Sequence, residues 1–356
     1  MSKKDKKKNK FPFVSVCTPT FNRRPFIPYM IKCFENQTYP KDRIEWIIVD
    51  DGTDKIEDMV INIPQVKYFK FDEKMTLGKK RNLLNEKSKG DIIVYMDDDD
   101  YYPAERITHA VEVLNKNPKV LCVGSSIMYI YFKHIHKMYE FGPYGPNHAT
   151  AATFAFRREL LKQTKFDELS CVAEEKQFLK NYTIPFAQLD SDKSILVFSH
   201  IHNSFDKKEL LKQMPNPYIH DTKVIVSDIV KEPEILDFFM NEIDNLLENY
   251  EPGKPENKQD VVKQINEIKE KREKMIKEHN EKQIQNQTYN NLMSKYKNDT
   301  TKTSQEYQSI IDNLTFTTQQ LMVENAQLKD KVIYLEDKIK KIINNKIQEI
   351  KQSKES

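Results

Sequence analysis

An apolar run that ends in four consecutive aspartates constrains this chain more than any other segment. Residues 92–96 read Ile-Ile-Val-Tyr-Met, and residues 97–100 are all Asp. A short apolar run of this kind predicts a buried strand. Adjacent carboxylates repel one another, so the fold needs a charge that offsets them, and a divalent cation suits carboxylate oxygen. Ligands of open α/β sheets bind beyond the carboxyl ends of the strands. The alternative is a solvated acidic turn.

Other segments place this strand in an alternating pattern of strands and helices. The predicted strands cover residues 13–17, 46–49, 66–69, 92–96 and 120–123, and the predicted helices cover 28–36 and 79–87. Such alternation predicts an α/β fold with a parallel sheet. The second strand also ends in carboxylates, Asp50 and Asp51. We therefore expect the two acidic strand ends to meet at one edge of the sheet.

Composition limits the size of the folded core and the class of partner. The chain has 356 residues, 38% hydrophobic and 31% charged, which is too polar for one compact globule. Its net charge of +3 argues against nucleic acid as a partner. Residues 1–10 are Lys-rich and predict a basic disordered tail. No segment has the roughly 18–20 apolar residues that cross a bilayer, so a soluble cytoplasmic protein without an integral membrane segment is expected.

The alternating pattern of strands and helices ends at about residue 205. Residues 251–255 read as a linker, and a heptad pattern follows near the end of the chain. Its seam positions are Leu314, Leu321, Leu328, Leu335 and Ile342, and Ile311, Thr318, Asn325, Val332 and Ile339. This spacing predicts a coiled coil and a homo-oligomer; the alternative is a long helix docked on its own domain. We expect a tail over 1–10, an α/β domain over 11–225, a helical linker region over 226–300 and a coiled coil over 301–350.

Two acidic pairs and one histidine pair are candidate functional residues, and for each pair a purely structural role is the alternative. Asp50 and Asp51 either contact a base or a ribose or cap the next helix. Glu174 and Glu175 are either a general base across the cleft or an ordinary exposed helix start. His200 and His202 alternate as on a strand, so they either reach a metal or form a surface pair. None of the seven glycines fits a dinucleotide or P-loop motif.

Taken in order, these segments resemble the family 2 glycosyltransferases, which have the GT-A fold. The resemblance covers roughly residues 11–205. It rests on the opening strand and turn at 16–23, the Val-Asp-Asp-Gly-Thr segment at 49–53, Lys80-Arg81-Asn82, the DxD-like strand at 90–100, and the segments at 154–160 and 174–175.

The resemblance implies a nucleotide-sugar donor, most often a UDP-sugar, Mn²⁺ or Mg²⁺, and transfer with inversion by single displacement. The acceptor would be a hydroxyl of a sugar, a protein or another molecule. The nucleotide would be held by Thr18, Pro19, Asn22, Asp50, Asp51, Arg81, Asp97 and Asp98. The metal would be held by Asp99, Asp97 and His202. Glu175, or Glu174, would be the catalytic base.

Two departures from the family pattern leave these assignments open by one residue. The usual acidic pair ends in aspartate, whereas both residues here are glutamate. The aspartate run also lies one residue closer to Pro103 than expected, so Asp98 could replace Asp99 as the ligand. One rival reading is an inactive glycosyltransferase-like scaffold that acts through its coiled coil. A nucleotidyltransferase is a second rival, but the glycine- and lysine-rich phosphate loop is missing.

Overall fold

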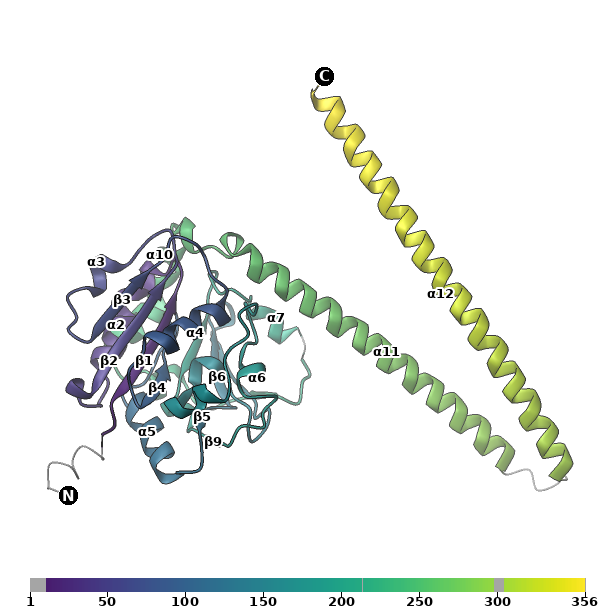
Figure 1. The fold of residues 1–356 in the computed structure, drawn as a ribbon, viewed down its shortest axis with the longest axis horizontal. Coiled ribbons are helices and arrows are strands. Elements are labelled where there is room, and N and C mark those ends of the chain that lie inside the picture. Colours follow the sequence, from purple (N-terminus) through teal and green to yellow (C-terminus); the bar gives the residue numbers. More distant parts are fainter. Residues whose placement is uncertain (1–10, 213, 298–303, 356) are drawn as a thin grey trace. The chain divides into compact units, whose positions relative to one another are not determined.

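The computed structural model describes residues 11–212, 214–297 and 304–355. The chain divides into two units, residues 1–272 and residues 273–356. The first unit is an α/β domain built on two sheets, and the second is helical (Figure 1). The α/β fold class with a C-terminal helical extension is confirmed. The predicted tail over residues 1–10 lies outside the described residues.

A seven-stranded sheet has the order β3-β2-β1-β4-β8-β5-β9. Its strands are β1 (Val14–Thr20), β2 (Ile44–Asp50), β3 (Val66–Lys70), β4 (Ile92–Tyr95), β5 (Cys122–Gly124), β8 (Ala155–Arg157) and β9 (Phe186–Gln188). All five predicted strands are present. The five predicted strands run parallel to one another, as expected, but the sheet as a whole is mixed, because β8 runs antiparallel to both β4 and β5. β4 and β5 are therefore parallel to each other, and β8 lies between them in the sheet.

A second sheet has the order β10-β6-β7-β11. Its strands are β6 (Met128–Phe132), β7 (Lys137–Phe141), β10 (Leu196–Ser199) and β11 (Ile219–Asp221). The α-helices of the first unit are α2 (Ile27–Glu35), α3 (Glu57–Val60), α4 (Leu77–Lys87), α5 (Arg106–Lys116), α6 (Glu175–Phe178), α7 (Lys208–Leu211), α8 (Val226–Ile229), α9 (Pro233–Asp237) and α10 (Ile243–Glu248). The two predicted helices correspond to α2 and α4.

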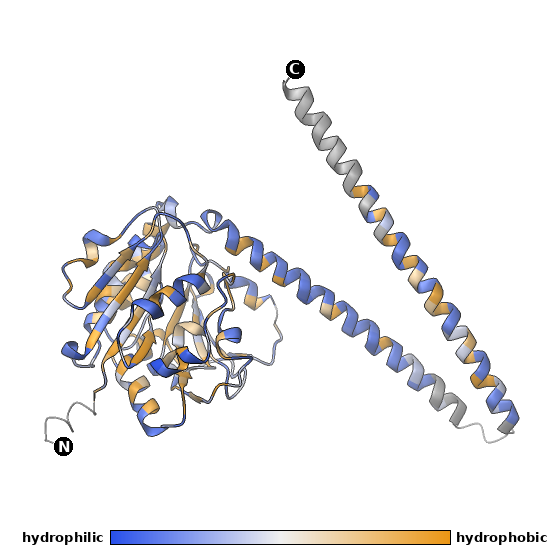
Figure 2. Ribbon diagram, in the orientation of Figure 1, coloured by the Kyte–Doolittle hydropathy of each residue, from blue (hydrophilic) through white to orange (hydrophobic). Residues whose placement is uncertain are grey.

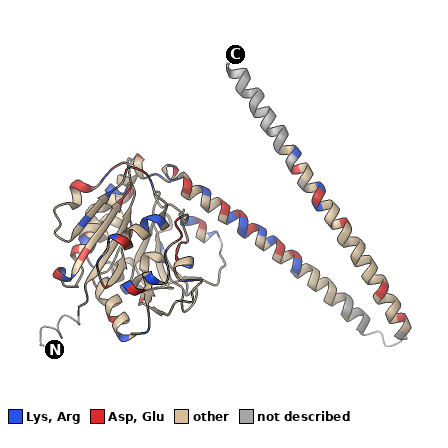
Figure 3. Cartoon of the chain, viewed as in Figure 1, with Lys and Arg blue, Asp and Glu red and all other residues tan. Residues whose placement is uncertain are grey.

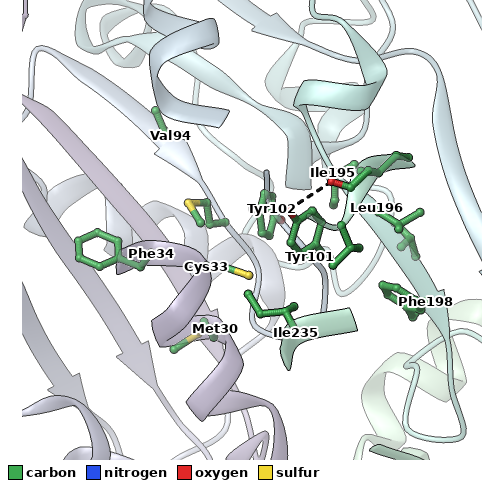
Figure 4. Close-up of a cluster of buried hydrophobic side chains, with 14 of the residues drawn as sticks. Met30, Cys33, Phe34, Val94, Tyr101, Tyr102, Ile195, Leu196, Phe198 and Ile235 are labelled. Carbon is green, nitrogen blue, oxygen red and sulfur yellow. Dashed lines mark hydrogen bonds between the residues drawn. The ribbon is translucent and has the colours of Figure 1, made fainter. Parts of the chain in front are cut away.

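The central strands form the core of the first unit. Every residue of β1 and β2 is buried, as expected for two strands that lie inside the sheet (Figure 2). The core also includes residues beyond position 225, since Ile235 of α9 lies beside Cys33 and Tyr101 (Figure 4). Phe239 stacks on Phe198 of β10 with ring centroids 4.2 Å apart. The domain boundaries given above stay predictions.

Two long helices end the described chain. α11 (Gln259–Lys297) begins in the first unit, and charged residues of both signs line it (Figure 3). α12 (Ser304–Glu355) covers the predicted heptads. Several of its apolar seam side chains are exposed, among them Leu321, Leu328 and Leu335. Within the described residues, no helix combines the length and the apolar character that crossing a membrane requires.

Candidate active site

A cavity of about 160 Å³ opens where β1 and β4 end. Both acidic ends of the strands were expected here, and the aspartate run after β4 lines the cavity directly. The lining residues are Pro19, Thr20, Phe21, Arg23, Lys74, Met75, Leu77, Lys80, Asp97, Asp98, Asp99, Cys171, Ser204, Lys258, Asp260 and Val261. The set combines acids with several cations, so the cavity is built for a charged ligand rather than an apolar one.

The carboxylates after β2 are buried and fully engaged by the protein. Asp50 accepts hydrogen bonds from the backbone N–H groups of Gly52, at 2.8 Å, and Ile56, at 3.1 Å, and from the Tyr68 hydroxyl, at 2.6 Å. Asp51 accepts one from the backbone N–H of Met75 at 2.6 Å. Asp50 therefore holds its own loop in place, although it does not cap α3, whose N-cap residue Ile56 has no side-chain cap hydrogen bond.

Asp51 also forms a buried ion pair with Lys80 of α4. The Lys80 ammonium donates a second hydrogen bond to the Thr20 carbonyl at 2.9 Å. Burial lowers the pKa of Lys80, and the neighbouring Asp51 carboxylate partly offsets this. The pair ties the end of β2 to α4 and places one cation of the cavity wall.

Arg81 connects the aspartate run to the predicted base segment. Its guanidinium binds Asp97 through two nitrogens, at 3.2 and 3.1 Å, and its Nε donates to Glu174 at 2.7 Å. The guanidinium also lies 4.6 Å from the centre of the Tyr95 ring. Burial lowers the pKa of Arg81, but Asp97 and Glu174 more than compensate and raise it above its usual value. Two acids far apart in sequence are thus held by one buried cation.

Asp98 and Asp99 share a different cation. Arg23 lies 3.6 Å from Asp98 and 3.1 Å from Asp99. The second oxygen of Asp98, Oδ2, is buried and has no hydrogen-bond partner among the described residues. Burial and the neighbouring Asp99 raise the pKa of Asp98 to about 7. Burial opposes ionisation of Asp99 as well, but Arg23 and His200 outweigh it and hold its pKa well below the usual range.

The two histidines lie after β10 in a turn, so the prediction that they alternate along a strand is wrong. His200 Nδ1 accepts a hydrogen bond from the backbone N–H of His202, and its Nε2 lies 2.7 Å from Asn203 Nδ2 and 3.5 Å from Asp99. His202 is 1% exposed, and neither ring nitrogen has a hydrogen-bond partner among the described residues. Burial, with Arg23 nearby, lowers its pKa to about 4. His202 is therefore a neutral ring with a free nitrogen lone pair.

Glu174 and Glu175 differ sharply although they are adjacent. Glu174 is buried and bound to Arg81, whereas Glu175 is half-buried at the start of α6 and forms no ion pair with any described residue. Burial, together with the charge of Glu174, raises the pKa of Glu175 to about 7. This is a carboxylate that exchanges a proton near neutral pH, as a general base must.

Five of the predicted nucleotide-binding residues make internal contacts and do not line the cavity. The contacts of Asp50, Asp51 and Arg81 are given above. Thr18 donates a hydrogen bond to the Met96 carbonyl at 2.7 Å and accepts one from Trp46 at 2.9 Å. Asn22 accepts one from the backbone N–H of Asp54 at 2.9 Å. Of the predicted site residues, Pro19, Asp97, Asp98 and Asp99 line the cavity, and the ligand roles of all of them stay predictions.

The donor atoms near the cavity suit a hard divalent cation. The free oxygen of Asp98 and the Asp99 carboxylate are ligand types that Mn²⁺ and Mg²⁺ accept. His202 has unpaired nitrogens but does not line this cavity. No group of three His, Cys, Asp or Glu side chains in the described part of the chain is gathered tightly enough to hold a metal alone. This fits a cation bound through one or two carboxylates plus the phosphates of a substrate.

Sequence reasoning missed the far wall of the cavity. Lys258, Asp260 and Val261 line it, and they come from the start of α11 and the residue before it. They follow a Pro- and Gly-containing segment that resembles a linker, and no local pattern distinguishes them from the solvated charges of α11. Only the packed structure places them beside residues more than 150 positions earlier in the chain.

Comparison with protein families identifies the core of the first unit. The model of glycosyl transferase family 2 matches residues 15–173. Residues 15–173 are a family 2 glycosyltransferase domain. The match covers the predicted motifs from β1 through the aspartate run and ends just before Glu174. The family agrees with the GT-A-like mixed sheet described above.

Curated relatives are glycosyltransferases by name. An uncharacterised glycosyltransferase of Haemophilus influenzae is 29% identical over 119 residues, 32% of this chain and 47% of that protein. The poly(ribitol-phosphate) beta-N-acetylglucosaminyltransferase TarS of Staphylococcus aureus is 27% identical over 108 residues, 29% of this chain and 19% of TarS. The matches therefore span half or less of these relatives.

Two solved structures are similar to part of this chain. S. aureus TarS 1–349 in complex with UDP-GlcNAc has a TM-score of 0.43 and 21% identity, over 52% of this chain and 58% of that one. The mannosyltransferase PcManGT of Pyrobaculum calidifontis, in complex with GDP-Man and Mn²⁺, has a TM-score of 0.42 and 18% identity, over 52% and 56%.

Proposed function

We propose that this protein is a metal-dependent, inverting glycosyltransferase that moves a sugar from a nucleotide-diphosphate sugar, in the first instance a UDP-sugar, to an acceptor hydroxyl. One observation carries the proposal. Glu175, a carboxylate with a pKa of about 7, adjoins a chain of buried contacts that runs from Glu174 through Arg81 to Asp97. A proton acceptor is thereby fixed relative to the aspartates of the cavity.

The donor would lie in the cavity with its diphosphate near the aspartate run. Asp98 and Asp99, which line the cavity, are the residues that would hold Mn²⁺ or Mg²⁺, and Asp98 Oδ2 has no hydrogen-bond partner among the described residues. When bound, the cation would supply Lewis-acid stabilisation of the negative charge that develops on the departing diphosphate. Without a cation, Arg23 offsets the negative charge of Asp98 and Asp99.

Glu175 would remove the proton from the acceptor hydroxyl. The acceptor oxygen then forms a bond to the anomeric carbon of the sugar as the bond from that carbon to the diphosphate oxygen breaks. The electron pair of the broken bond stays on the nucleoside diphosphate, and the proton stays on Glu175. Arg81 would act as a positioning residue, because it orients Glu174 beside the base and Asp97 beside the donor.

Ligand-dependent thermal unfolding tests the donor site first. UDP, GDP, CMP and dTDP would each be added with and without Mn²⁺. A ligand that binds only the folded state at 100 times its dissociation constant adds roughly 2.7 kcal/mol, so a metal-dependent shift with UDP is expected. Absence of a shift with every nucleotide would favour the inactive scaffold. Turnover of an NTP with a sugar phosphate would favour a nucleotidyltransferase.

We also propose that α12 forms a homo-oligomeric coiled coil. The exposed seam residues support this, because Leu321 is 57% and Leu328 54% exposed in the single chain. Replacing both by Glu should lower the mass measured by light scattering. The matched control replaces the exposed Gln320 and Gln327, at the preceding heptad positions, by Glu, and should leave the mass unchanged. A monomeric wild-type chain would contradict the proposal.

A further inference from the structure

The segment that follows α10 is anchored on the loops that form the candidate donor site. The Tyr250 hydroxyl donates to Asp54 at 2.8 Å, and the Asn22 side chain donates to the Pro252 carbonyl at 2.9 Å. Gly253 packs so closely that a Cβ there would lie 2.6 Å from His202 Nδ1 and 2.9 Å from the Asn22 carbonyl oxygen. A glycine is therefore required where this segment crosses the site.

The first turns of α11 are anchored on the opposite wall. Asp260 forms an ion pair with Lys74. Gln264 accepts hydrogen bonds from the backbone N–H groups of Cys171, at 2.7 Å, and Val172, at 3.1 Å, and donates one to the Leu169 carbonyl at 3.1 Å. Residues 250–264, here called the closing segment, are thus fixed on both sides of the cavity.

Lys258 lies between these two anchors and enters the cavity. It is 6% exposed, and its ammonium donates to the Ser204 hydroxyl at 2.9 Å. Burial, together with the charge of Arg23, lowers the pKa of Lys258 well below its usual value, and Asp99 and Asp98 offset this only in part; Lys258 forms no ion pair within the described residues. The other cations of the cavity wall each have a carboxylate partner: Arg23 has Asp98 and Asp99, Lys74 has Asp260, and Lys80 has Asp51. Lys258 is the cation of the described cavity that lacks a close anionic partner.

We propose that Lys258 binds the diphosphate of the donor, so that the closing segment completes a site whose other parts come from the family 2 domain. This inference rests on the proposed function. A buried cation without an anionic partner is costly, and a diphosphate would supply the missing negative charge beside the aspartates. The role is one of binding, and it predicts that Lys258 distinguishes a nucleotide from its nucleoside.

The test compares UDP with uridine, each with Mn²⁺, by calorimetric titration of the full chain. Lys258→Met keeps the apolar stem and removes the charge. It should weaken UDP binding by roughly 10- to 100-fold, as expected for one hydrogen bond to a charged group, and leave uridine binding unchanged. Lys258→Arg should retain most of the affinity for UDP. Lys254→Met is the matched control, because Lys254 lies on the same segment but pairs with Glu251 at the surface, and it should change neither.

Each other result has one meaning. If the wild-type chain binds UDP and Lys258→Met binds it equally well, the inference is overturned and the proposed function stands. If Lys258→Met weakens UDP and uridine alike, the lysine only supports the fold of the pocket, and its role toward the phosphates is overturned. If the wild-type chain binds neither UDP nor the other nucleoside diphosphates, the proposed function fails and the inference fails with it.

Discussion

The acidic ends of β2 and β4 look alike in sequence and differ in the structure. After β2, Asp50 has three hydrogen-bond donors, and Asp51 has a backbone N–H and Lys80. After β4, Asp98 and Asp99 share one arginine, and Asp98 and Asp100 each keep a buried oxygen without a partner in the described structure. Asp50 and Asp51 hold the fold together, whereas Asp98 and Asp100 keep oxygen atoms that no described residue binds.

The same contrast occurs within one pair at the other side of the site. Glu174 is bound by Arg81, whereas its neighbour Glu175 has no ion-pair partner among the described side chains. We therefore expect an acid that already has a cationic partner to stabilise the fold, and an adjacent acid without one to bind ligand or take part in the reaction. Substitutions that remove one member of each pair test this division, because supporting acids should affect stability and unpartnered acids should affect ligand binding or turnover.

Glu175→Gln should have the largest effect. Without a base, transfer should fall by 10²- to 10⁴-fold, the usual contribution of general base catalysis, while metal-dependent UDP binding and the unfolding temperature stay near wild type. Initial rates of sugar transfer measure the first, and calorimetry the second. Wild-type turnover in this variant would assign the base elsewhere.

Asp51→Asn should be the most destabilising of these changes. It leaves Lys80 buried without its anion, and breaking a buried ion pair by removing one partner costs about 3–5 kcal/mol. Urea denaturation would measure the lower free energy of unfolding. Wild-type stability together with lost nucleotide binding would mean that Asp51 contacts the base instead of supporting the fold.

Asp98→Asn should weaken ligand binding without lowering the stability of the fold. Removing one acid from a repelling run should leave the free energy of unfolding unchanged or raise it by about 1 kcal/mol, because Asp98 lacks a full set of partners. Stabilisation by UDP with Mn²⁺ should be lost. A large fall in stability would place Asp98 with the supporting acids, and a retained metal-dependent shift would remove it from the ligand set.

The smallest expected change is in pH dependence. Since the pKa of Glu175 is raised to about 7, the base is protonated in acid, and the transfer rate should rise with pH through 7 and then level off. Its contribution to stability has the opposite sign, because a raised pKa in the folded state favours folding at low pH and that benefit is lost as the pH passes 7. A transfer rate that is flat between pH 6 and 8 would contradict the assignment.

The strands and their acidic ends could be predicted because local pattern determines them. Ile92 to Tyr95 is buried on both faces and reads as an apolar run, and the order of motifs indicated the family. Which acid of a pair is already bound could not be predicted, since Arg81 and Glu174 are 93 positions apart in the sequence. Lys258 was missed for the same reason: its environment is set by distant loops, and its neighbours in sequence look like solvated helix.

The hydrogen bonds of Gln264 to the backbone of Cys171 and Val172 have a consequence for exchanging parts between relatives. The family match ends at residue 173, between these two anchored residues and Glu174. A chimaera that transplants only residues 15–173 would carry the strand ends and the aspartates, yet it would inherit a foreign attachment for the loop that presents the base. Transplanting the closing segment together with residues 15–173 would keep these hydrogen bonds. The part of the chain that must be exchanged as one piece is therefore discontinuous in sequence.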